Sequence, residues 1–335
     1  MNHSDVIIQG HQVSIGYRHG HHTTLIHHHL NFQLRRGQLT CLLGSNGAGK
    51  STLLRTLAAV QPALEGDITL MGRPLAAYSE LERSRTVGVV FTDKTQAGGL
   101  TVAELVGLGR QPHTGFFGRL NRHDKALIED AMQKTGIAHK RHSYMAELSD
   151  GERQKAMIAK ALVQECPLIL LDEPTAFLDI VSRLEIMHLL HHLAATEHKA
   201  ILMSTHDVEQ ALVLSDRLWL LNKATGLECG TTEDLILCHR MDTLFPTDRN
   251  IQFDLMHGVF SPSVRGDHRI HLTASNQILL HWAQNALNRN NYLCLPTPQP
   301  GLMQINVLSP HNILLNQNEH LSSFEQLIER IKGME

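Results

Sequence analysis

The amino-acid sequence predicts an α/β fold built on a mainly parallel sheet, and three observations favour this class. Short apolar runs without polar alternation at 38–43, 168–171 and 200–204 are typical of strands covered on both faces. Stretches with helical periodicity separate these runs, and a glycine-rich loop joins the first run to a helix. Buried strands that alternate with helices favour a parallel sheet packed on both sides.

The elements follow in chain order. Segments 5–17 and 24–34 have the pattern of antiparallel strands, which predicts that the sheet is mixed. The first buried strand ends at Gly44, and apolar residues at three- and four-residue spacing predict a helix from Lys50 until Pro62. Further helices are expected at about 123–136, 151–164 and 180–196.

The texture of the sequence changes near residue 250, where Asn, Gln, His and Pro become more frequent. We therefore expect two domains, 1–250 and 251–335, the second being a small α+β module. Its strand candidates are 291–296 and 302–308, and a final amphipathic helix is expected near 322–333. The module either tunes activity or is a structural appendage, and the residues leave both roles open.

Composition excludes several classes of protein. The chain has 335 residues, enough for about two domains. Its net charge of -3 lacks the global basic field of a nucleic-acid-binding protein, so no nucleic-acid partner is expected. No apolar run reaches the roughly eighteen residues of a membrane span. Five scattered cysteines and the lack of an export-type N-terminus favour reduced thiols and the cytosol.

A phosphate-binding loop lies between the first buried strand and the helix that follows it. Its glycines let the backbone curl so that N–H groups point at phosphate oxygens, and the helix presents its positive end to the same anion. Lys50 is expected at the β and γ phosphates, and Ser51 is expected to hold Mg²⁺. The nucleotide-binding residues of this segment are Gly44, Ser45, Asn46, Gly47, Ala48, Gly49, Lys50, Ser51 and Thr52.

An acidic pair follows the second buried strand. Asp172 stands at the strand tip, where a carboxylate orders the metal shell, and Glu173 is the candidate base for an attacking water. An acidic pair after an apolar strand is also common in ordinary solvated loops. Its combination with the phosphate loop favours the catalytic role.

These elements resemble the ATP-binding subunit of ABC transporters over roughly residues 5–245. The most diagnostic stretch is 148–152, Leu-Ser-Asp-Gly-Glu, at the position of the family signature, which lies in a helical subdomain at about 90–165. The resemblance implies a P-loop NTPase cassette in which Ser149 and Gly151 contact the ATP held by a second cassette. It therefore implies ATP and Mg²⁺ as ligands and a homodimer as the working assembly.

Other segments match the family in order. Residues 176–179 look like the D-loop, and 204–207 look like the switch, which implies that His206 contacts the γ phosphate. Tyr17 is similar to the aromatic residue that stacks on adenine. An ordinary strand aromatic is the alternative for this tyrosine.

Two regions depart from the family pattern. Asp150 replaces a glycine and Glu152 replaces a glutamine, which places acids beside an anionic ligand and either slows or retunes turnover. Where the family carries a glutamine that links nucleotide to the membrane partner, this chain has Thr92. Thr92 is therefore a candidate metal-side residue, unless a local shift brings in Gln96.

A narrower likeness lies at 109–120, which is similar to cassettes that power uptake of iron chelates, haem or vitamin B12. It implies an importer ATPase that drives polytopic membrane permease subunits, and indirectly a substrate-binding protein, from the cytoplasmic face of the inner membrane. The alternatives are a soluble ABC ATPase of translation or DNA repair and a regulatory cassette with weak hydrolysis.

Histidines gather near the N-terminus, and two clusters separated by four residues suggest a hairpin with a metal site. The bland alternative is favoured, because no cysteine or carboxylate shares the segment and adjacent strand residues point to opposite faces. The residues in question are His19, His21, His22, His27, His28 and His29.

Overall fold

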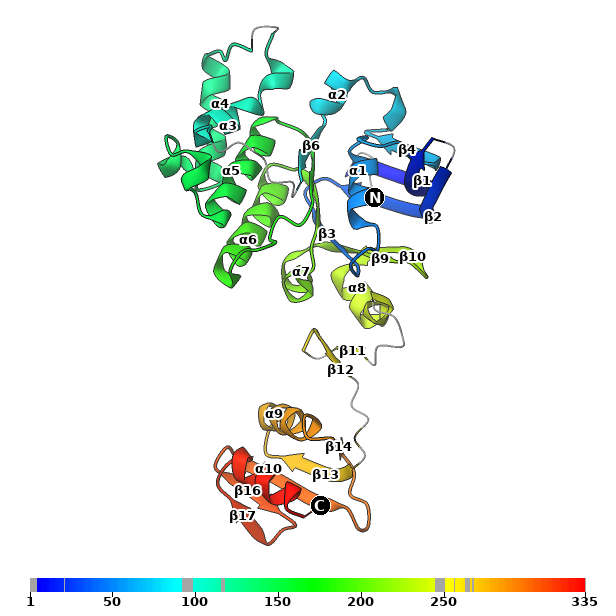
Figure 1. Ribbon diagram of the computed structural model, residues 1–335, viewed down its shortest axis with the longest axis vertical. Coiled ribbons are helices and arrows are strands. Elements are labelled where there is room, and N and C mark those ends of the chain that lie inside the picture. Colours follow the sequence, from blue (N-terminus) through cyan, green and yellow to red (C-terminus); the bar gives the residue numbers. More distant parts are fainter. Residues whose placement is uncertain are drawn as a thin grey trace. The chain divides into compact units, whose positions relative to one another are not determined.

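The computed structural model describes residues 5–20, 22–91, 99–115, 118–244, 251–255, 257–262, 266 and 268–334 (Figure 1). The chain divides into two compact units. The first comprises Met1–Arg249 with Phe253–Val259, and the second comprises Asn250–Gln252 with Phe260–Glu335. No helix of the described residues is long and apolar enough to cross a membrane.

A six-stranded sheet forms the centre of the first unit, and four of its five strand pairings are parallel. The strands β3, β7 and β8 are buried along their whole length, which is why their sequences show no polar alternation. The edge pair β9 and β10 is antiparallel, so the sheet is mixed as expected. In spatial order the strands are β10 (Gly226–Thr231), β9 (Arg217–Asn222), β3 (Leu39–Leu43), β8 (Ala200–Ser204), β7 (Leu168–Leu171) and β6 (Val87–Val90).

The early antiparallel strands belong to a second sheet of their own. β1 (Val6–His19) pairs with β2 (His22–Arg35) on one side and with β4 (Glu65–Leu70) on the other, and β5 (Arg73–Pro74) extends the edge. The mixed character of the central sheet therefore comes from β10 and not from these strands. The strands β2 and β4 that flank β1 each have one exposed face, as antiparallel strands commonly do. The parallel strands of the central sheet are covered on both faces instead.

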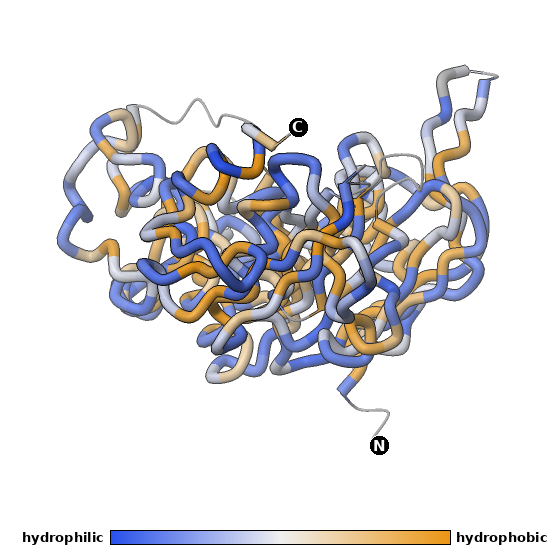
Figure 2. The backbone as a smooth tube through the Cα atoms, turned by 90° about the horizontal axis from the view of Figure 1, so that it is seen from below, coloured by the Kyte–Doolittle hydropathy of each residue, from blue (hydrophilic) through white to orange (hydrophobic). Residues whose placement is uncertain are grey.

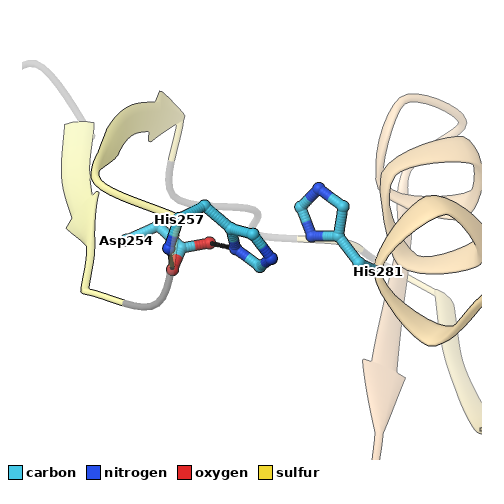
Figure 3. Close-up of side chains that lie close together, drawn as sticks. All are labelled: Asp254, His257 and His281. Atoms are coloured by element: carbon cyan, nitrogen blue, oxygen red, sulfur yellow. Dashed lines mark hydrogen bonds and ion pairs between the residues drawn. The ribbon is translucent and has the colours of Figure 1, made fainter. Parts of the chain in front are cut away.

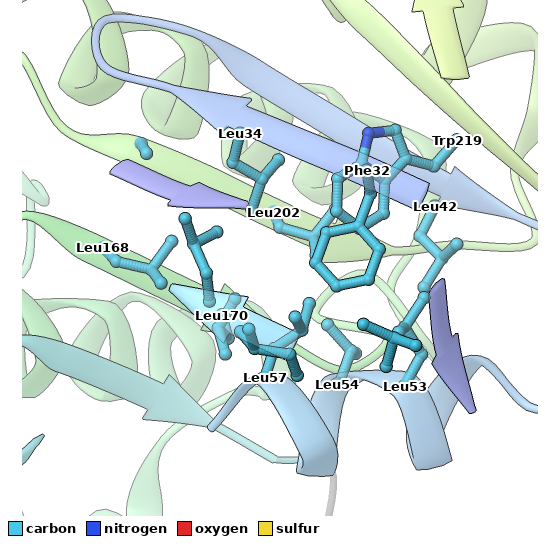
Figure 4. Close-up of a cluster of buried hydrophobic side chains, with 14 of the residues drawn as sticks. Phe32, Leu34, Leu42, Leu53, Leu54, Leu57, Leu168, Leu170, Leu202 and Trp219 are labelled. Carbon is cyan, nitrogen blue, oxygen red and sulfur yellow. The ribbon is translucent and has the colours of Figure 1, made fainter. Parts of the chain in front are cut away.

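Helix α1 (Lys50–Leu57) contributes to the core that joins the two sheets. Leu53, Leu54 and Leu57 are buried in this core together with β2 and the central strands (Figure 4). The rings of Phe32 and Trp219 meet there with their centroids 5.1 Å apart. Figure 2 shows hydrophobic and hydrophilic stretches following one another along the backbone. This packing fixes the start of α1 against the end of β3.

A helical group covers residues 102–163 (Figure 1, left of β6). Each of its helices begins with a reciprocal capping box, in which a Thr, Asn or Ser side chain accepts a backbone N–H and an acid three residues later accepts the cap N–H. The helices are α3 (Val102–Leu108), α4 (Arg122–Lys134) and α5 (Asp150–Val163). The other helices of this unit are α2 (Glu80–Ser84), α6 (Ile180–Thr196), α7 (Val208–Leu214) and α8 (Thr232–Leu237).

The second unit has its own core and a five-stranded sheet covered by two helices. Its spatial order is β14 (Tyr292–Leu295), β13 (His268–Ala274), β15 (Met303–Ser309), β16 (Asn312–Leu315) and β17 (Glu319–Leu321). The helices are α9 (Gln277–Asn288) and α10 (Phe324–Lys332). A two-stranded ribbon is formed by β11 (Ile251–Asp254) and β12 (Val259–Pro262), and each of these strands contributes residues to both units.

Candidate functional site

The loop between β3 and α1 has the backbone geometry that an anion-binding loop needs. Gly47 and Gly49 have φ values of +73° and +100°, in the left-handed region that favours glycine. A Cβ on Gly44 would lie 2.5 Å from the carbonyl oxygen of Leu221, so this position has no room for a side chain. The loop therefore fits a group that approaches the backbone closely and accepts its N–H donors.

Lys50 begins α1 and turns its ammonium back into the loop. Its Nζ donates to the carbonyl oxygens of Gly44 at 2.9 Å and Ser45 at 3.4 Å. Burial lowers the pKa of this ammonium, while the carboxylates of Glu173 and Asp172 act in the opposite direction. The groups that accept hydrogen bonds from this ammonium are neutral carbonyls, while the two acids act on it through space. Because a buried charge is stabilised by a direct counter-ion, the ammonium is placed to bind an anion in the loop.

The acidic pair sits at the end of β7 and is fixed by Ser204 of β8. The Ser204 hydroxyl donates to Asp172 Oδ1 at 2.6 Å and accepts the backbone N–H of Glu173 at 2.9 Å. Because β7 and β8 run parallel, their carboxyl ends meet at the same edge of the sheet as the end of β3. The acids and the phosphate loop thus share one edge.

Glu173 and His206 face each other across this edge. Glu173 adopts a φ of +50°, uncommon for a non-glycine residue, and its Oε1 lies 2.5 Å from Nε2 of His206. The His206 side chain is 45% exposed and that of Glu173 is 30% exposed, so both are reached from solvent. The pair is placed for proton transfer or for orienting a water.

The donors near the loop are oxygen atoms of the kind that Mg²⁺ prefers. Asp172 offers a carboxylate that is 9% exposed, and Ser51 offers a hydroxyl from the first turn of α1. This hard-donor chemistry fits the metal predicted from the sequence. Thr92 lies outside the described residues, as does Gln96.

Tyr17 and Thr52 are joined directly. The Tyr17 hydroxyl lies 2.7 Å from the Thr52 hydroxyl, and Thr52 is buried in the first turn of α1. The tyrosine is 36% exposed. The contact holds the aromatic side chain beside the helix that follows the phosphate loop.

The signature residues form the start of α5. Ser149 is the N-cap, its hydroxyl accepts the N–H of Glu152, and the Glu152 carboxylate accepts the N–H of Ser149. That backbone hydrogen bond, aided by Lys140, lowers the pKa of Glu152. A Cβ on Gly151 would lie 3.1 Å from the hydroxyl of Ser182, so this glycine packs against the start of α6.

The unusual acids of the signature have partners within their own chain. Asp150 Oδ1 accepts from Nη1 of Arg153 at 2.6 Å, and Arg153 also donates to the carbonyl of Leu148. The carboxylate that replaces the signature glycine is therefore paired with a cation three residues later. The expected repulsion of an anionic ligand is reduced accordingly.

The D-loop segment is tied to the switch segment by an arginine. Asp179 caps α6 by accepting from Ser182, while Arg183 donates to the carbonyl of Leu178 and pairs with Asp207 at 3.4 Å. Phe177 projects into solvent at 89% exposure with a φ of +64°. An exposed aromatic held on a fixed loop suits a contact with another chain.

The predicted residues fall into two groups in space. The loop, Lys50, the acidic pair and His206 share the sheet edge. The signature begins α5, which Figure 1 shows on the other side of β6 from α1. Sequence reasoning missed the bridging role of Ser204 and the contact of His27 with the loop. His27 is one of three consecutive histidines in a largely polar strand, so the pattern does not single it out.

The N-terminal histidines do not act together in the described structure. His27 turns inward, and the rings of His28 and His29 meet edge to face at 5.0 Å. His21 and the side chain of His19 lie outside the described residues. Elsewhere, on the β11–β12 ribbon, His257 Nδ1 lies 2.7 Å from Oδ2 of Asp254 (Figure 3). Within the described residues of the β1–β2 hairpin, no three potential ligands converge on a metal position.

Comparisons with known proteins show which family this chain resembles along most of its first unit. The family model described as ABC transporter matches residues 27–176. The petrobactin import ATP-binding protein of Bacillus anthracis is 36% identical over 70% of this chain and 84% of its own length. The iron(3+)-hydroxamate import ATP-binding protein of Bacillus subtilis is 35% identical over 72% of this chain and 89% of its own length. A solved metal-chelate type ABC transporter in an inward-facing conformation is 28% identical, with a TM-score of 0.62, over 72% of this chain and 89% of its own.

Proposed function

Because this chain belongs to the family of ABC transporter ATP-binding subunits, we propose that it hydrolyses ATP to drive uptake of an iron chelate, haem or cobalamin-type substrate. The observation that supports this function is a complete phosphate loop on the same sheet edge as Asp172, Glu173 and His206. The import functions of the similar proteins favour an importer over a soluble translation or repair factor.

In the proposed reaction water attacks the γ phosphorus of ATP, the bond from that phosphorus to the β–γ bridging oxygen breaks, and ADP leaves with inorganic phosphate as the other product. Glu173 accepts the proton of that water, and His206, 2.5 Å away, orients the carboxylate and contacts the γ phosphate. The Lys50 ammonium exchanges its hydrogen bonds to loop carbonyls for hydrogen bonds to the β and γ phosphates. The loop residues from Gly44 to Thr52 surround these phosphates. Ser51, Asp172 and Thr92 would hold Mg²⁺, which would supply charge neutralisation at the phosphates.

The second half of each ATP site comes from a second cassette. In one chain α5 and α1 stand on different sides of β6, so Ser149 and Gly151 need another copy to meet a nucleotide on the loop. The N-terminus of α5 offers backbone N–H groups and a partial positive charge to that γ phosphate. Tyr17, fixed by its bond to Thr52, stacks on the adenine.

The assembly works at the cytoplasmic face of the inner membrane. Permease subunits bind the helical group of residues 102–163, and a substrate-binding protein delivers cargo to the permease from the other side. Residues 109–120, which lie in this group, carry the likeness to iron-chelate and vitamin B12 importers.

A transport assay with matched lysine variants tests the function. Permease-reconstituted vesicles are loaded with MgATP and given a labelled ferric siderophore, haem or cobalamin. We expect uptake and phosphate release with the parent chain and loss of both with Lys50→Ala. The control is Lys223→Ala, which removes an exposed lysine after β9 and leaves both rates unchanged.

Each outcome separates the alternatives. Hydrolysis without uptake of any of the three substrates would remove the cargo class and leave the ATPase. ATP binding without hydrolysis in the reconstituted complex would indicate the regulatory cassette. Failure of the chain to associate with any permease would favour a soluble ATPase.

A further inference from the structure

A buried histidine on β2 contacts the phosphate loop from behind. His27 is 3% exposed, and its Nε2 lies 2.6 Å from the carbonyl oxygen of Ala48. A carbonyl oxygen only accepts hydrogen bonds, so Nε2 carries a proton and donates it. Two side chains therefore hold the loop by different carbonyl groups: Lys50 binds that of Gly44, and His27 binds that of Ala48.

An irregular strand pairing brings the imidazole to this place. Ile15 pairs with His27 between two register shifts, one before it from Val13 and one after it at Gly16. In a regular strand adjacent side chains point to opposite faces, but a bulge re-aims them. As a result both Ile26 and His27 reach Gly49, where a Cβ would lie 2.8 Å from Ile26 Cγ2 and 3.3 Å from the imidazole.

The contact with Ala48 controls the next backbone donor. The peptide unit between Ala48 and Gly49 is planar and trans, so its C=O and N–H point in opposite directions. Holding the Ala48 oxygen toward β2 therefore aims the Gly49 N–H away from β2. Gly49 caps α1 in the left-handed region at φ +100°, a conformation with many alternatives for glycine, so an external anchor has a direct effect on it.

We propose that His27 is a positioning residue of the nucleotide site, whose Nε2–H fixes the Ala48–Gly49 peptide so that the Gly49 N–H meets a phosphate oxygen. The proposal rests on the ATP-binding function proposed above. His27 does not touch the nucleotide. It acts through a peptide that contacts phosphate equally in the bound substrate and in the transition state.

This role predicts an effect on affinity with little effect on turnover. The variant His27→Leu fills the site with a side chain of similar size but removes the N–H donor. The Ala48–Gly49 peptide is then no longer held by a hydrogen bond from β2. We expect the Kd for MgATP and MgADP and the KM for ATP to rise about 3- to 10-fold, the range of one hydrogen bond, with kcat within about twofold. Isothermal titration and steady-state phosphate release measure the two quantities.

Two further variants separate the donor from simple packing. His27→Gln places an amide N–H at the same number of bonds from Cβ, and we expect it to recover nucleotide affinity to within about twofold of the parent. His28→Leu changes the exposed neighbour on the same strand and leaves affinity unchanged. Unfolding temperatures without nucleotide show whether a variant is merely less stable.

The outcomes distinguish this proposal from the function on which it rests. A parent chain that neither binds nor hydrolyses ATP would overturn both. A parent that binds ATP while His27→Leu binds equally well, or while His27→Gln loses as much affinity as His27→Leu, would overturn the role of His27 alone. If His27→Leu fails to fold, ¹⁵N NMR of the parent imidazole decides: an Nδ1–H tautomer with unprotonated Nε2 contradicts the proposal.

Discussion

Glu173 is held in an uncommon backbone conformation by contacts on both sides. Its N–H is bound by the Ser204 hydroxyl, its φ is +50°, and its carboxylate meets His206. Such strain persists only where surrounding contacts determine it, and it concentrates at functional sites. The same serine fixes Asp172, so one hydroxyl orients both acids of the pair.

Replacement of the carboxylate tests the base at this residue. Glu173→Gln keeps the shape and the contact with His206 but removes the proton acceptor, so we expect kcat to fall about 10²- to 10⁴-fold with ATP affinity retained. The variant is also expected to accumulate as an ATP-bound dimer on size-exclusion chromatography. Glu209→Gln, an exposed acid on α7, is the control. Parental turnover in Glu173→Gln would show that another group is the base.

Lys50 predicts a pH dependence of nucleotide affinity. Its ammonium binds phosphate only when charged, and burial lowers its pKa below the ordinary value of 10.5. Affinity for ADP is therefore constant at lower pH and falls once pH rises above this lowered pKa. Titrations from pH 7 to 10 are expected to show the decline before pH 10.5. In Lys50→Arg, which stays charged, the profile is expected to be flat; a decline of equal size there would assign the effect to another group.

At the scale of elements, a buried ion pair organises the helical group. Arg110, after α3, donates to Asp124 in the first turn of α4 at 2.9 Å, to the carbonyl of Val163 at the end of α5, and to Glu165. Arg110 and Asp124 are both almost fully buried. A single guanidinium thus ties together the three helices of the helical group.

Breaking this pair is expected to be costly. Arg110→Met leaves the Asp124 carboxylate buried without its counter-ion, which lowers the free energy of unfolding by about 3 kcal/mol. Asp124→Asn retains an oxygen for its own cap, so the double variant is expected to recover part of that loss. Arg141→Met, which breaks an exposed pair with Glu129, is expected to cost less than about 1 kcal/mol. Urea denaturation measures all three, and equal losses for the buried and exposed pairs would contradict this assignment.

At the scale of the whole molecule, the two units have separate cores. The first centres on α1 and two sheets, and the second on a five-stranded sheet with α9 and α10. Phe253 of β11 is buried, and its N–H donates to Asp242 of the first unit. A shortened chain that is meant to keep the first unit intact should therefore retain the β11–β12 ribbon.

A chain that ends at Pro262 tests what the second unit does. Because the phosphate loop, the acids and their supporting core all lie in the first unit, we expect this variant to bind MgATP with parental affinity. Phosphate release with permease present is the second measurement. Changed coupled turnover would identify a tuning module, and unchanged turnover would identify an appendage. Loss of ATP binding would show that the second unit is needed to build the site.

The sequence by itself determined the features that depend on neighbouring residues. The buried strands β3, β7 and β8, the helices between them and the phosphate loop follow from local apolar runs, helical periodicity and glycine spacing. Only the tertiary structure decided which sheet β1 and β2 join, that Ser204 bridges the two acids, and that a bulge turns His27 onto the loop. These features depend on pairing register between segments far apart in the chain, and a shift of one residue moves every side chain to the other face. No local pattern encodes that register, because it is set by the packing of the complete core.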